Sequence, residues 1–358
     1  MSGKRVFVAM SGGVDSSVVA LLLKEQGYDV TGITMQIWPQ EEDDSKACCS
    51  LSAVNDARRV AWHLDIPHYV MNFRDEFEAK VIRYFCDEYQ QGRTPNPCIA
   101  CNKYIKFDSL LDKALAMGAD LIATGHYARV IPGSDGEYSL VKGLDPGKDQ
   151  SYVLYNLTQR QLSHTMFPLG EYNKSMTREM AREARLPVAD KPESQEICFV
   201  PSGKYSEFVE QYVGQVDRSG EFRSTGGQKI SSHGGIHRYT IGQRKGLGVA
   251  LGHPVYVTGI DPATRTVFLG ENEDLFKRVL IARDVNYISG HPFTEPMPVT
   301  AKIRYAAPAA SAVATSLADG SLKVEFEQAQ RAITPGQAVV VYDGDRVLGG
   351  GTIVQVLD

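Results

Sequence analysis

The sequence predicts an α/β protein in which a doubly wound parallel sheet is followed by a small central domain and a C-terminal β-barrel. Over roughly the first 200 residues, short apolar runs alternate with helical patterns, which is typical of a parallel sheet covered by helices. A glycine-rich turn follows the first apolar run. Beyond about residue 202 the pattern changes to short alternating runs rich in Gly, Thr and Val, which favours β-structure. The 358 residues suffice for three domains, which we expect at residues 1–200, 201–275 and 276–358.

The composition is that of an ordinary globular protein, with 43% hydrophobic and 23% charged residues. The sequence contains neither the apolar core of a signal peptide nor a long apolar run, so we expect a cytoplasmic protein without a membrane partner. Six cysteines are too few for a disulfide scaffold and suggest thiol chemistry or metal binding. The net charge of −5 argues against a surface covered by nucleic acid, but it allows a local basic face.

The first element pair is a buried strand at residues 5–10 and a helix that includes residues 18–23 and ends near Gly27. Between them lies Ser-Gly-Gly-Val-Asp-Ser at residues 11–16. A strand, a glycine turn and a helix start form an anion site, because backbone N–H groups point outward and the helix dipole adds positive charge. Asp15 would repel a bare polyphosphate, so its presence favours either a bridging Mg²⁺ or a contact with backbone N–H groups of the loop.

This loop matches neither the Walker A pattern nor the dinucleotide-binding pattern, because the required lysine and glycine spacings are absent. It resembles the pyrophosphatase-type loop (PP-loop) of ATP-dependent adenylating enzymes, which cleave ATP between the α and β phosphates. The alternative is an ordinary glycine turn in a βα unit.

The next elements continue the βα alternation. We expect strands at residues 30–38 and 68–71, a strand that opens into a glycine loop within residues 121–129, and helices at residues 53–64, 77–91 and 107–117. Met35, near the end of the second strand, is interpreted either as an adenine contact or as a core methionine. Between two of these helices, the two prolines of residues 92–103 predict a rigid loop that holds a thiol in place.

The second half of the chain begins with helices at residues 158–164 and 174–185. A polar loop then leads into a short apolar strand at residues 197–200, and a last clear helix follows at residues 205–213. Residues 234–246 form a basic, glycine-spaced segment. The strands expected for the barrel lie at residues 299–305, 322–326, 338–342 and 351–356, with a turn at residues 343–345.

The cysteines suggest a reaction. Cys98 and Cys101 form a C-x-x-C pair, which is a weak signal for zinc, redox chemistry or neither, and the adjacent cysteines at residues 48–49 lack the spacing of a second zinc pair. Cys86 lies in an apolar helical pattern and is expected in the core. Cys198 occupies a polar loop, as Cys101 does, and could meet it across the ATP site. An adenylating loop with two loop thiols suggests sulfur transfer, in which ATP converts a carbonyl oxygen into a leaving group and persulfide sulfur replaces it.

Five motifs in this order closely resemble the tRNA-specific 2-thiouridylase family. They are Ser-Gly-Gly-Val-Asp-Ser at residues 11–16, Thr-Pro-Asn-Pro-x-x-x-Cys-Asn-Lys at 94–103, Thr-Gly-His-Tyr-Ala-Arg at 124–129, Lys-Asp-Gln-Ser-Tyr at 148–152 and Ser-Gln-Glu-Ile-Cys-Phe at 194–199. The likeness covers essentially the whole chain, including residues 239–244 and 334–337. It implies 2-thiolation of the wobble uridine (U34) in tRNAs for Lys, Glu and Gln, with Cys198 as the persulfide carrier and Cys101 as the second catalytic thiol.

The resemblance also implies the binding residues. Those for ATP are Ala9, Met10, Ser11, Gly12, Gly13, Val14, Asp15, Ser16, Met35 and Gly125, and those for tRNA are Asn96, Pro97, Cys98, His126, Lys148, Asp149, Gln150, Arg304, Tyr305 and Gln337. The implied cofactors are ATP and Mg²⁺, and the implied partners are tRNA and a persulfide donor, which would be a cysteine desulfurase or a sulfur-relay protein. Further basic residues expected on the tRNA face are Lys103, Lys106, His237, Arg238, Arg244 and Lys245.

Two alternatives remain open at this point. Cys98 stands where some members of the family carry an aspartate, and Cys98, Cys101 and Cys198 together have the composition of a three-thiolate iron–sulfur site with one open iron. In the persulfide reaction, Cys101 attacks the Cys198 persulfide to release hydrosulfide, or the persulfide attacks the base directly. Other functions that fit part of the sequence are an amidating or ligating PP-loop synthetase and a non-catalytic, nucleotide-gated tRNA-binding protein.

Overall fold

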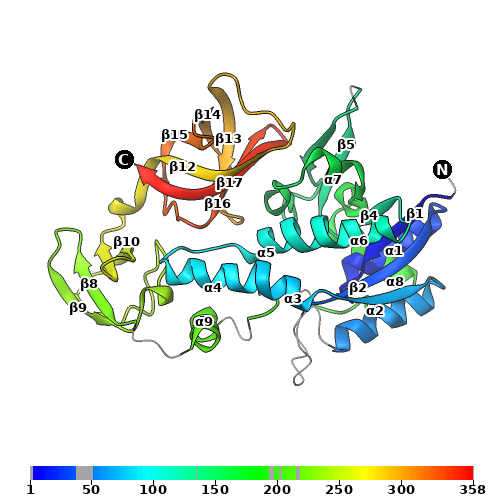
Figure 1. Ribbon diagram of the computed structural model, residues 1–358, viewed down its shortest axis with the longest axis horizontal. Coiled ribbons are helices and arrows are strands. Elements are labelled where there is room, and N and C mark those ends of the chain that lie inside the picture. The colour runs from blue at the N-terminus through cyan, green and yellow to red at the C-terminus, as the bar shows by residue number, and fades with distance from the viewer. Residues whose placement is uncertain are drawn as a thin grey trace.

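The computed structural model describes residues 3–37, 51–134, 136–192, 197–200, 204–214 and 218–357. Within these ranges the chain forms a parallel sheet covered by helices, a small antiparallel-rich sheet and a barrel (Figure 1). The cysteines at residues 48–49 and the Ser-Gln-Glu part of the 194–199 motif lie outside the described residues. The predicted α/β class with a C-terminal barrel is confirmed.

The parallel sheet has the strand order β3-β2-β1-β4-β7. Its strands are β1 (Arg5–Ala9), β2 (Asp29–Gln36), β3 (His68–Asn72), β4 (Leu121–Ala123) and β7 (Thr165–Met166). Val6 pairs with Val30 on one side and with Leu121 on the other, so the order reverses between β1 and β4. In such sheets a ligand binds at the carboxyl ends of the strands where this reversal occurs.

The two faces of the sheet pack against different helices. Val6 and Val8 belong to a core cluster with residues of α1 (Val14–Glu25), α2 (Leu51–His63) and α8 (Lys174–Glu183). Phe7 points to the opposite face, where it joins the cluster formed by the long helices described next. This alternation along β1 gives the doubly wound arrangement that the sequence predicts.

Two long helices lie on the second face and run side by side (Figure 1). One consists of α3 (Arg74–Phe77), the π-helical segment η1 (Glu78–Ile82) and α4 (Arg83–Gln90). The other consists of α5 (Pro97–Ala100), the π-helical segment η2 (Cys101–Ser109) and α6 (Leu110–Ala116).

The second of these helices corrects the expectation of a rigid loop that extends to residue 103. It begins ten residues earlier than expected, at Pro97. Asn96 is its N-cap, and the Asn96 side chain accepts hydrogen bonds from the backbone N–H groups of Cys98 and Ile99. An Asn-Pro pair favours a helix start, because the amide side chain caps the first turn and proline at the first position has no N–H to satisfy.

A second correction concerns the apolar stretch at residues 197–200, which was expected to be a strand. The described residues form a turn there, closed by a hydrogen bond of 3.0 Å from Val200 N–H to the carbonyl of Ile197. Phe199 and Val200 are buried in the core, so their apolar character reflects burial rather than sheet pairing. By contrast, the strand that opens into a glycine loop within residues 121–129 is confirmed, because β4 ends at Ala123 and residues 124–127 form a loop before β5 (Ala128–Pro132).

Short elements complete the first part of the chain. They are β6 (Tyr138–Lys142), η3 (Ser151–Leu154), α7 (Gln159–Ser163), η4 (Pro168–Glu171) and α9 (Tyr205–Val213). Strands β5 and β6 form a hairpin, and Val141 of β6 pairs with Arg346 of the barrel.

The central sheet has the order β10-β11-β8-β9, made by β8 (Gly220–Ser224), β9 (Lys229–His233), β10 (Tyr256–Asp261) and β11 (Thr266–Gly270), with η6 (Ile236–Arg238) and η7 (Glu273–Leu275) beside it. The barrel strands are β12 (Phe276–Tyr287), β13 (Met297–Lys302), β14 (Ala310–Ser316), β15 (Leu322–Arg331), β16 (Ala338–Asp343) and β17 (Arg346–Leu357). Because β12 also pairs with β17, these strands close into a barrel, as the sequence predicts.

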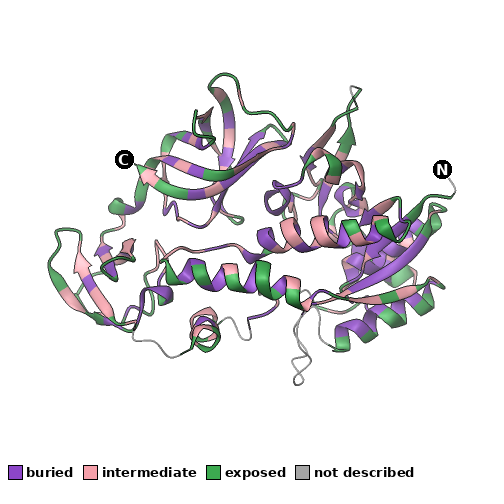
Figure 2. Cartoon of the chain, in the orientation of Figure 1, coloured by how far each residue is buried: buried purple, intermediate pink, exposed green. Residues whose placement is uncertain are grey.

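Burial follows these layers (Figure 2). The central strands of the parallel sheet are buried, whereas the outer faces of α2 and α4 are exposed. No helix in the described ranges is both long enough and apolar enough to span a membrane.

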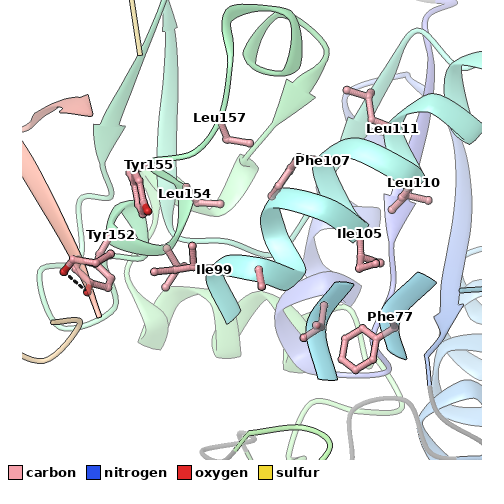
Figure 3. Close-up of a cluster of buried hydrophobic side chains, with 14 of the residues drawn as sticks. Phe77, Ile99, Ile105, Phe107, Leu110, Leu111, Tyr152, Leu154, Tyr155 and Leu157 are labelled. Carbon is pink, nitrogen blue, oxygen red and sulfur yellow. Dashed lines mark hydrogen bonds between the residues drawn. The ribbon is translucent and has the colours of Figure 1, made fainter. Parts of the chain in front are cut away.

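The helix at residues 97–116 is held by apolar side chains along most of its length (Figure 3). Ile105, Phe107, Leu110 and Leu111 are fully buried or nearly so, in the same cluster as Phe77. The Phe107 ring lies 5.8 Å, between ring centroids, from Phe167 in an edge-to-face arrangement.

We expect Phe107→Ala to destabilise the first domain by about 3 to 5 kcal/mol, because it removes a fully buried ring and leaves a cavity. Urea denaturation of the full chain measures the loss. Met117→Ala is the matched control, because Met117 ends the same helix with 47% of its surface exposed, and a change below about 0.5 kcal/mol is expected there. Equal effects of the two substitutions would contradict the assigned packing.

Candidate functional site

The loop after β1 has the geometry of an anion site. Gly12 adopts φ +69, and a Cβ atom there would lie 2.2 Å from the carbonyl oxygen of Ala53, so a larger residue does not fit. Gly13 is the N-cap residue of α1, and as a glycine it has no side chain to cap the first N–H groups of that helix. These N–H groups and the positive end of the helix dipole are therefore available to an anion.

Hydroxyl groups hold this loop in shape. Ser16, which is 4% exposed, accepts a hydrogen bond of 3.2 Å from the Ser11 N–H and donates one of 3.3 Å to the carbonyl of Gly13. Ser17 donates a second hydrogen bond, of 2.8 Å, to the same carbonyl. Ser16 and Ser17 thus serve the loop itself, whereas Ser11 lies on its exposed side.

Asp15 makes contacts that the sequence does not predict. Its Oδ1 accepts hydrogen bonds from Lys174 Nζ at 2.6 Å and from the Tyr127 hydroxyl at 2.9 Å. Lys174 is the first residue of α8, and its side chain is 13% exposed. The charge of Asp15 is therefore balanced by a lysine from a distant element, and these two contacts run to side chains, whereas the sequence suggests a bridging Mg²⁺ or backbone N–H groups of the loop.

A second lysine that the sequence analysis missed lies behind the loop. Lys191 Nζ donates to the Gly12 carbonyl at 3.0 Å and forms an ion pair of 2.6 Å with Asp56 of α2. Burial alone would raise the pKa of Asp56, but Lys191 and Arg59 outweigh it and hold that pKa below its usual value. Lys174 and Lys191 are single lysines without a characteristic spacing, so no sequence pattern identifies them.

The residues expected at ATP converge on one edge of the sheet. A Cβ on Gly125, just after β4, would lie 3.0 Å from both the Cβ of Asp15 and the N atom of Ser16, so the loop after β4 is in direct contact with the first turn of α1. Ala9 and Met35 end neighbouring strands and are partly exposed. Met10 and Val14, by contrast, are buried in the core, so they can offer a nucleotide little beyond their backbone.

The two expected catalytic thiols pack against the same hydrophobic cluster, which includes Phe77 and Phe85. Cys101 is partly buried one turn into the helix that begins at Pro97, and Cys98 is exposed in its first turn. Cys198 is partly buried in the turn at residues 197–200.

The position of Cys198 is fixed by its neighbour. The ring of Phe199 lies edge-to-face against Phe77 and Phe85, at centroid distances of 5.6 and 5.3 Å. Cys86 is fully buried, and burial raises the pKa of its thiol to about 12, in agreement with a core role.

An iron–sulfur site does not fit the positions of the cysteines. In the ranges that the structure describes, no three His, Cys, Asp or Glu side chains lie close enough together to hold one metal ion. Cys98, Cys101 and Cys198 are all described, and they are not arranged as a ligand set.

His126, one of the residues expected at tRNA, is buried. His126 is 8% exposed, and its Nδ1 lies 2.6 Å from the Thr124 hydroxyl. Burial, with a smaller effect of the charge on Lys106, holds the pKa of His126 well below its usual value, so the ring is neutral.

Two further residues that were expected to contact tRNA form hydrogen bonds within the protein. Asp149 accepts hydrogen bonds from the N–H groups of Gly143 and Ser151, at 3.2 and 3.1 Å. Gln150 Oε1 accepts one of 3.0 Å from the N–H of Tyr127. Lys148, next to them, is partly exposed.

The expected barrel residues face the first domain. Tyr305 is 42% exposed, and its pKa is raised by burial and by the nearby charges of Asp149 and Cys98. Lys302, which the sequence analysis missed, lies with its Nζ 5.7 Å from the ring centroid of Tyr305 and 5.9 Å from that of Tyr152. Its neighbour Arg304 donates a hydrogen bond of 3.2 Å to the carbonyl of Arg331.

Gln337 of the barrel reaches the segment that precedes the cysteine helix. Its Nε2 donates a hydrogen bond of 2.8 Å to the Thr94 carbonyl. Asn96 and Pro97 lie directly after this contact, at the helix start.

Comparisons with known proteins cover the whole chain. Residues 4–202 match a family model described as tRNA methyl transferase HUP domain, residues 206–271 a tRNA methyl transferase PRC-barrel domain and residues 277–353 an aminomethyltransferase beta-barrel domain. The chain is 55% identical to a tRNA-specific 2-thiouridylase MnmA of Clostridium perfringens, over 100% of both chains. It is 56% identical to the protein of that name from Carboxydothermus hydrogenoformans, over 98% of this chain and 97% of that one.

The likeness to solved structures is weaker than the likeness to these relatives. A 4-thiouridine synthetase–RNA complex with bound ATP is 17% identical and covers 59% of this chain and 50% of its own, with a TM-score of 0.35. A likeness of this size is too weak to carry a functional argument.

We expect Lys191→Met to lower stability by about 1 to 2 kcal/mol near neutral pH, because it leaves the Asp56 carboxylate buried with one cation fewer. The folded-state pKa of Asp56 is depressed, so its contribution is present above its ordinary pKa of 3.8 and is lost as the pH falls through the folded value. The stability deficit of the variant should therefore shrink toward acid pH.

Melting temperatures of the wild type and the variant from about pH 7 down to about pH 2.5, which extends below the ordinary pKa of Asp56, measure this trend. Lys204→Met is the control, because Lys204 forms an ion pair with Glu207 in which both side chains are more than half exposed. A deficit that does not change with pH would contradict the Asp56–Lys191 coupling.

Proposed function

The chain belongs to the tRNA-specific 2-thiouridylase family, and we propose that it replaces O2 of the wobble uridine of tRNA with sulfur in an ATP-dependent reaction. Cys198 carries the sulfur as a persulfide, and Cys101 is the second catalytic thiol. The tRNAs for Lys, Glu and Gln are the substrates. The relatives that carry the 2-thiouridylase name match end to end, which supports this reaction over the methyl transfer in the family-model descriptions.

One observation carries the proposal. An anion-binding loop and two cysteines that are 97 positions apart in the sequence, Cys101 and Cys198, belong to one domain, and both thiols pack against one hydrophobic cluster. An amidating or ligating synthetase would use the loop but neither thiol, and a non-catalytic binding protein would need no thiol at all. Thiolation uses all three features.

The first step is adenylation of the base. The uridine O2 attacks the α-phosphate of ATP, which enters with Mg²⁺, and pyrophosphate leaves. The uncapped N–H groups at the start of α1 bind the departing pyrophosphate, while the Lys174–Asp15 pair keeps the first turn of the helix in place. The product is an adenylated base, from which O2 can leave as part of AMP in the next step.

The second step transfers sulfur, by one of two balanced routes. In one, the Cys101 thiolate attacks the Cys198 sulfur of the persulfide, hydrosulfide leaves, and hydrosulfide displaces AMP from C2. In the other, the outer persulfide sulfur attacks C2 and displaces AMP, after which Cys101 attacks Cys198 and releases the thiolated base. Both routes end with a Cys101–Cys198 disulfide, which a thiol reductant must reduce before the next turnover.

Further parts of the proposal concern partners and organisation. A cysteine desulfurase or a sulfur-relay protein supplies the persulfide, and the reaction takes place in the cytoplasm, where its tRNA substrate is found. Residues 1–200 carry the chemistry, and residues 201–275 and 276–358 form the parts that help to hold the tRNA. Arg304, Tyr305 and Gln337 are the tRNA-facing residues proposed for the barrel.

The direct test is mass analysis of tRNA nucleosides after incubation with ATP, Mg²⁺ and a persulfide donor. The wild type should form 2-thiouridine, and Cys101→Ser and Cys198→Ser should each abolish the product, because the thiols act in series. The double variant should be no worse than either single variant. Cys86→Ser is the matched control and should retain activity. Formation of 2-thiouridine by the Cys198→Ser variant would refute the role of Cys198 as the persulfide carrier.

We expect Asp15→Asn and Lys174→Met to slow tRNA-dependent pyrophosphate release by about tenfold each, because each breaks one charge-assisted contact at the loop. The two residues form one pair, so the double variant should be no slower than the slower single variant. Asp112→Asn, which breaks an exposed ion pair with Arg160, is the control. Normal adenylation by both single variants, with unchanged affinity for tRNA, would contradict the role assigned to the loop.

A further inference from the structure

Thr94 uses all three of its hydrogen-bonding groups in contacts with the other two domains. Its N–H donates to the Pro335 carbonyl at 2.9 Å, and its carbonyl accepts from Gln337 Nε2 at 2.8 Å, so two of the contacts are with the barrel. Its hydroxyl donates to the Thr240 hydroxyl of the central domain at 3.2 Å. One residue of the catalytic domain is therefore tied to both other domains.

Steric contacts surround the same segment. Gly336 adopts φ +91, and a Cβ there would lie 2.8 Å from the N atom of Thr94. On the other side, Gly92 adopts φ +66, and a Cβ there would lie 2.5 Å from Cγ2 of Ile260 in the central domain. The barrel and the central domain thus approach residues 92–94 as closely as backbone atoms permit.

This segment leads directly into the cysteine helix. Asn96, two residues after Thr94, is the N-cap, and Cys98 and Cys101 lie in the first turn and at the start of the next. Pro95 is buried, and Pro97 is the first residue of the helix. Proline fixes its own φ and restricts the residue before it, so a shift of Thr94 is passed on to the helix start rather than absorbed.

Packing and hydrogen bonds act together at this end of the helix. Ile99 and Ala100 are buried there, but a cavity of about 70 Å³ lies between the helix start and the barrel, lined by Asn96, Ile99 and Lys103 on one side and Gly336 and Ala338 on the other. Farther along, Ile105, Phe107, Leu110 and Leu111 are enclosed by buried side chains (Figure 3). The hydrogen bonds of Thr94 therefore add to packing at the end that carries the thiols.

We propose that Thr94 is a positioning residue, through which the contacts of the central and barrel domains set the placement of Cys101 for sulfur transfer. The inference rests on the proposed function, because it takes Cys101 as a reacting thiol. Thr94 itself touches no substrate. Its hydroxyl links the Thr240 segment to the helix start, so the position of the central domain becomes part of the geometry of the catalytic site.

The test uses four single variants of the full chain and the double variant of Thr94→Val with Thr240→Val. Thr94→Val and Thr240→Val each remove one end of the hydroxyl contact and keep a branched side chain, whereas Thr94→Ser keeps the hydroxyl. Thr264→Val is the matched control, because it removes a Thr–Thr contact of 2.9 Å, to Thr266, that lies within the central domain. The readouts are the 2-thiouridine formation rate, the affinity for ATP and deuterium exchange of the amides of residues 98–101 without substrates.

Thr94→Val and Thr240→Val should each slow thiolation about fivefold, the size of one neutral hydrogen bond, with an unchanged Kd for ATP. The thiolation rate of the double variant of Thr94→Val with Thr240→Val should equal that of each single variant. Exchange at residues 98–101 should be at least about threefold faster in both. In Thr94→Ser, the thiolation rate and the amide exchange at residues 98–101 should both lie close to those of the wild type. Thr264→Val should change neither of them.

Thiolation by Thr94→Val at the wild-type rate, or an equal loss in Thr94→Ser, would overturn the inference. A wild type that forms no 2-thiouridine would refute the proposed function instead. In that case the exchange measurement still decides whether Thr94 positions the helix start. Faster exchange confined to Thr94→Val and Thr240→Val would support it, and unchanged exchange would refute it. Thr240→Val keeps the test valid if Thr94→Val fails to fold.

Discussion

The close approach of backbone segments around residues 11–16 is the constraint on which the rest of the site depends. Gly12 lies against the backbone of Ala53 on one side of the loop, and Gly125 lies against Asp15 on the other. The start of α2, the loop after β1, the first turn of α1 and the loop after β4 are therefore brought together, with no room for a side chain at Gly12 or Gly125. That proximity exposes the helix N–H groups at the point where the strand order reverses, and it places the loop within reach of lysines from elsewhere in the chain.

These lysines balance the charges of the two acidic groups beside the loop, together with Arg59 at Asp56. Lys174 neutralises Asp15 in front of the loop, and Lys191 neutralises Asp56 behind it. Both arise from the last third of the first domain, at and after α8. The anion site is thus completed by residues that join it late in the chain, so the short motif at residues 11–16 is necessary for the geometry but does not contain all of it.

Most of the fold could be predicted from the sequence, because apolar periodicity and turn residues determine the order of strands and helices. The start of the cysteine helix could also have been found from the Asn-Pro pair at residues 96–97, which is a capping signal. The strand expected at residues 197–200 was wrong, since an apolar run cannot by itself distinguish a strand from a buried turn such as the one around Phe199. The contacts of Lys174, Lys191 and Lys302 could not be predicted, because each depends on tertiary packing and none follows a spacing rule.

The closure of the barrel between β12 and β17 has a consequence for how its residues act. In an open sheet an edge strand can detach while its neighbours remain paired, but in the barrel formed within residues 276–357 each strand is paired on both sides. Local loosening is therefore opposed from two directions, and the barrel opens cooperatively or not at all. Arg304, Tyr305 and Gln337 lie in loops next to the ends of strands of this barrel, so a displacement of the barrel as a whole moves all three positions at once.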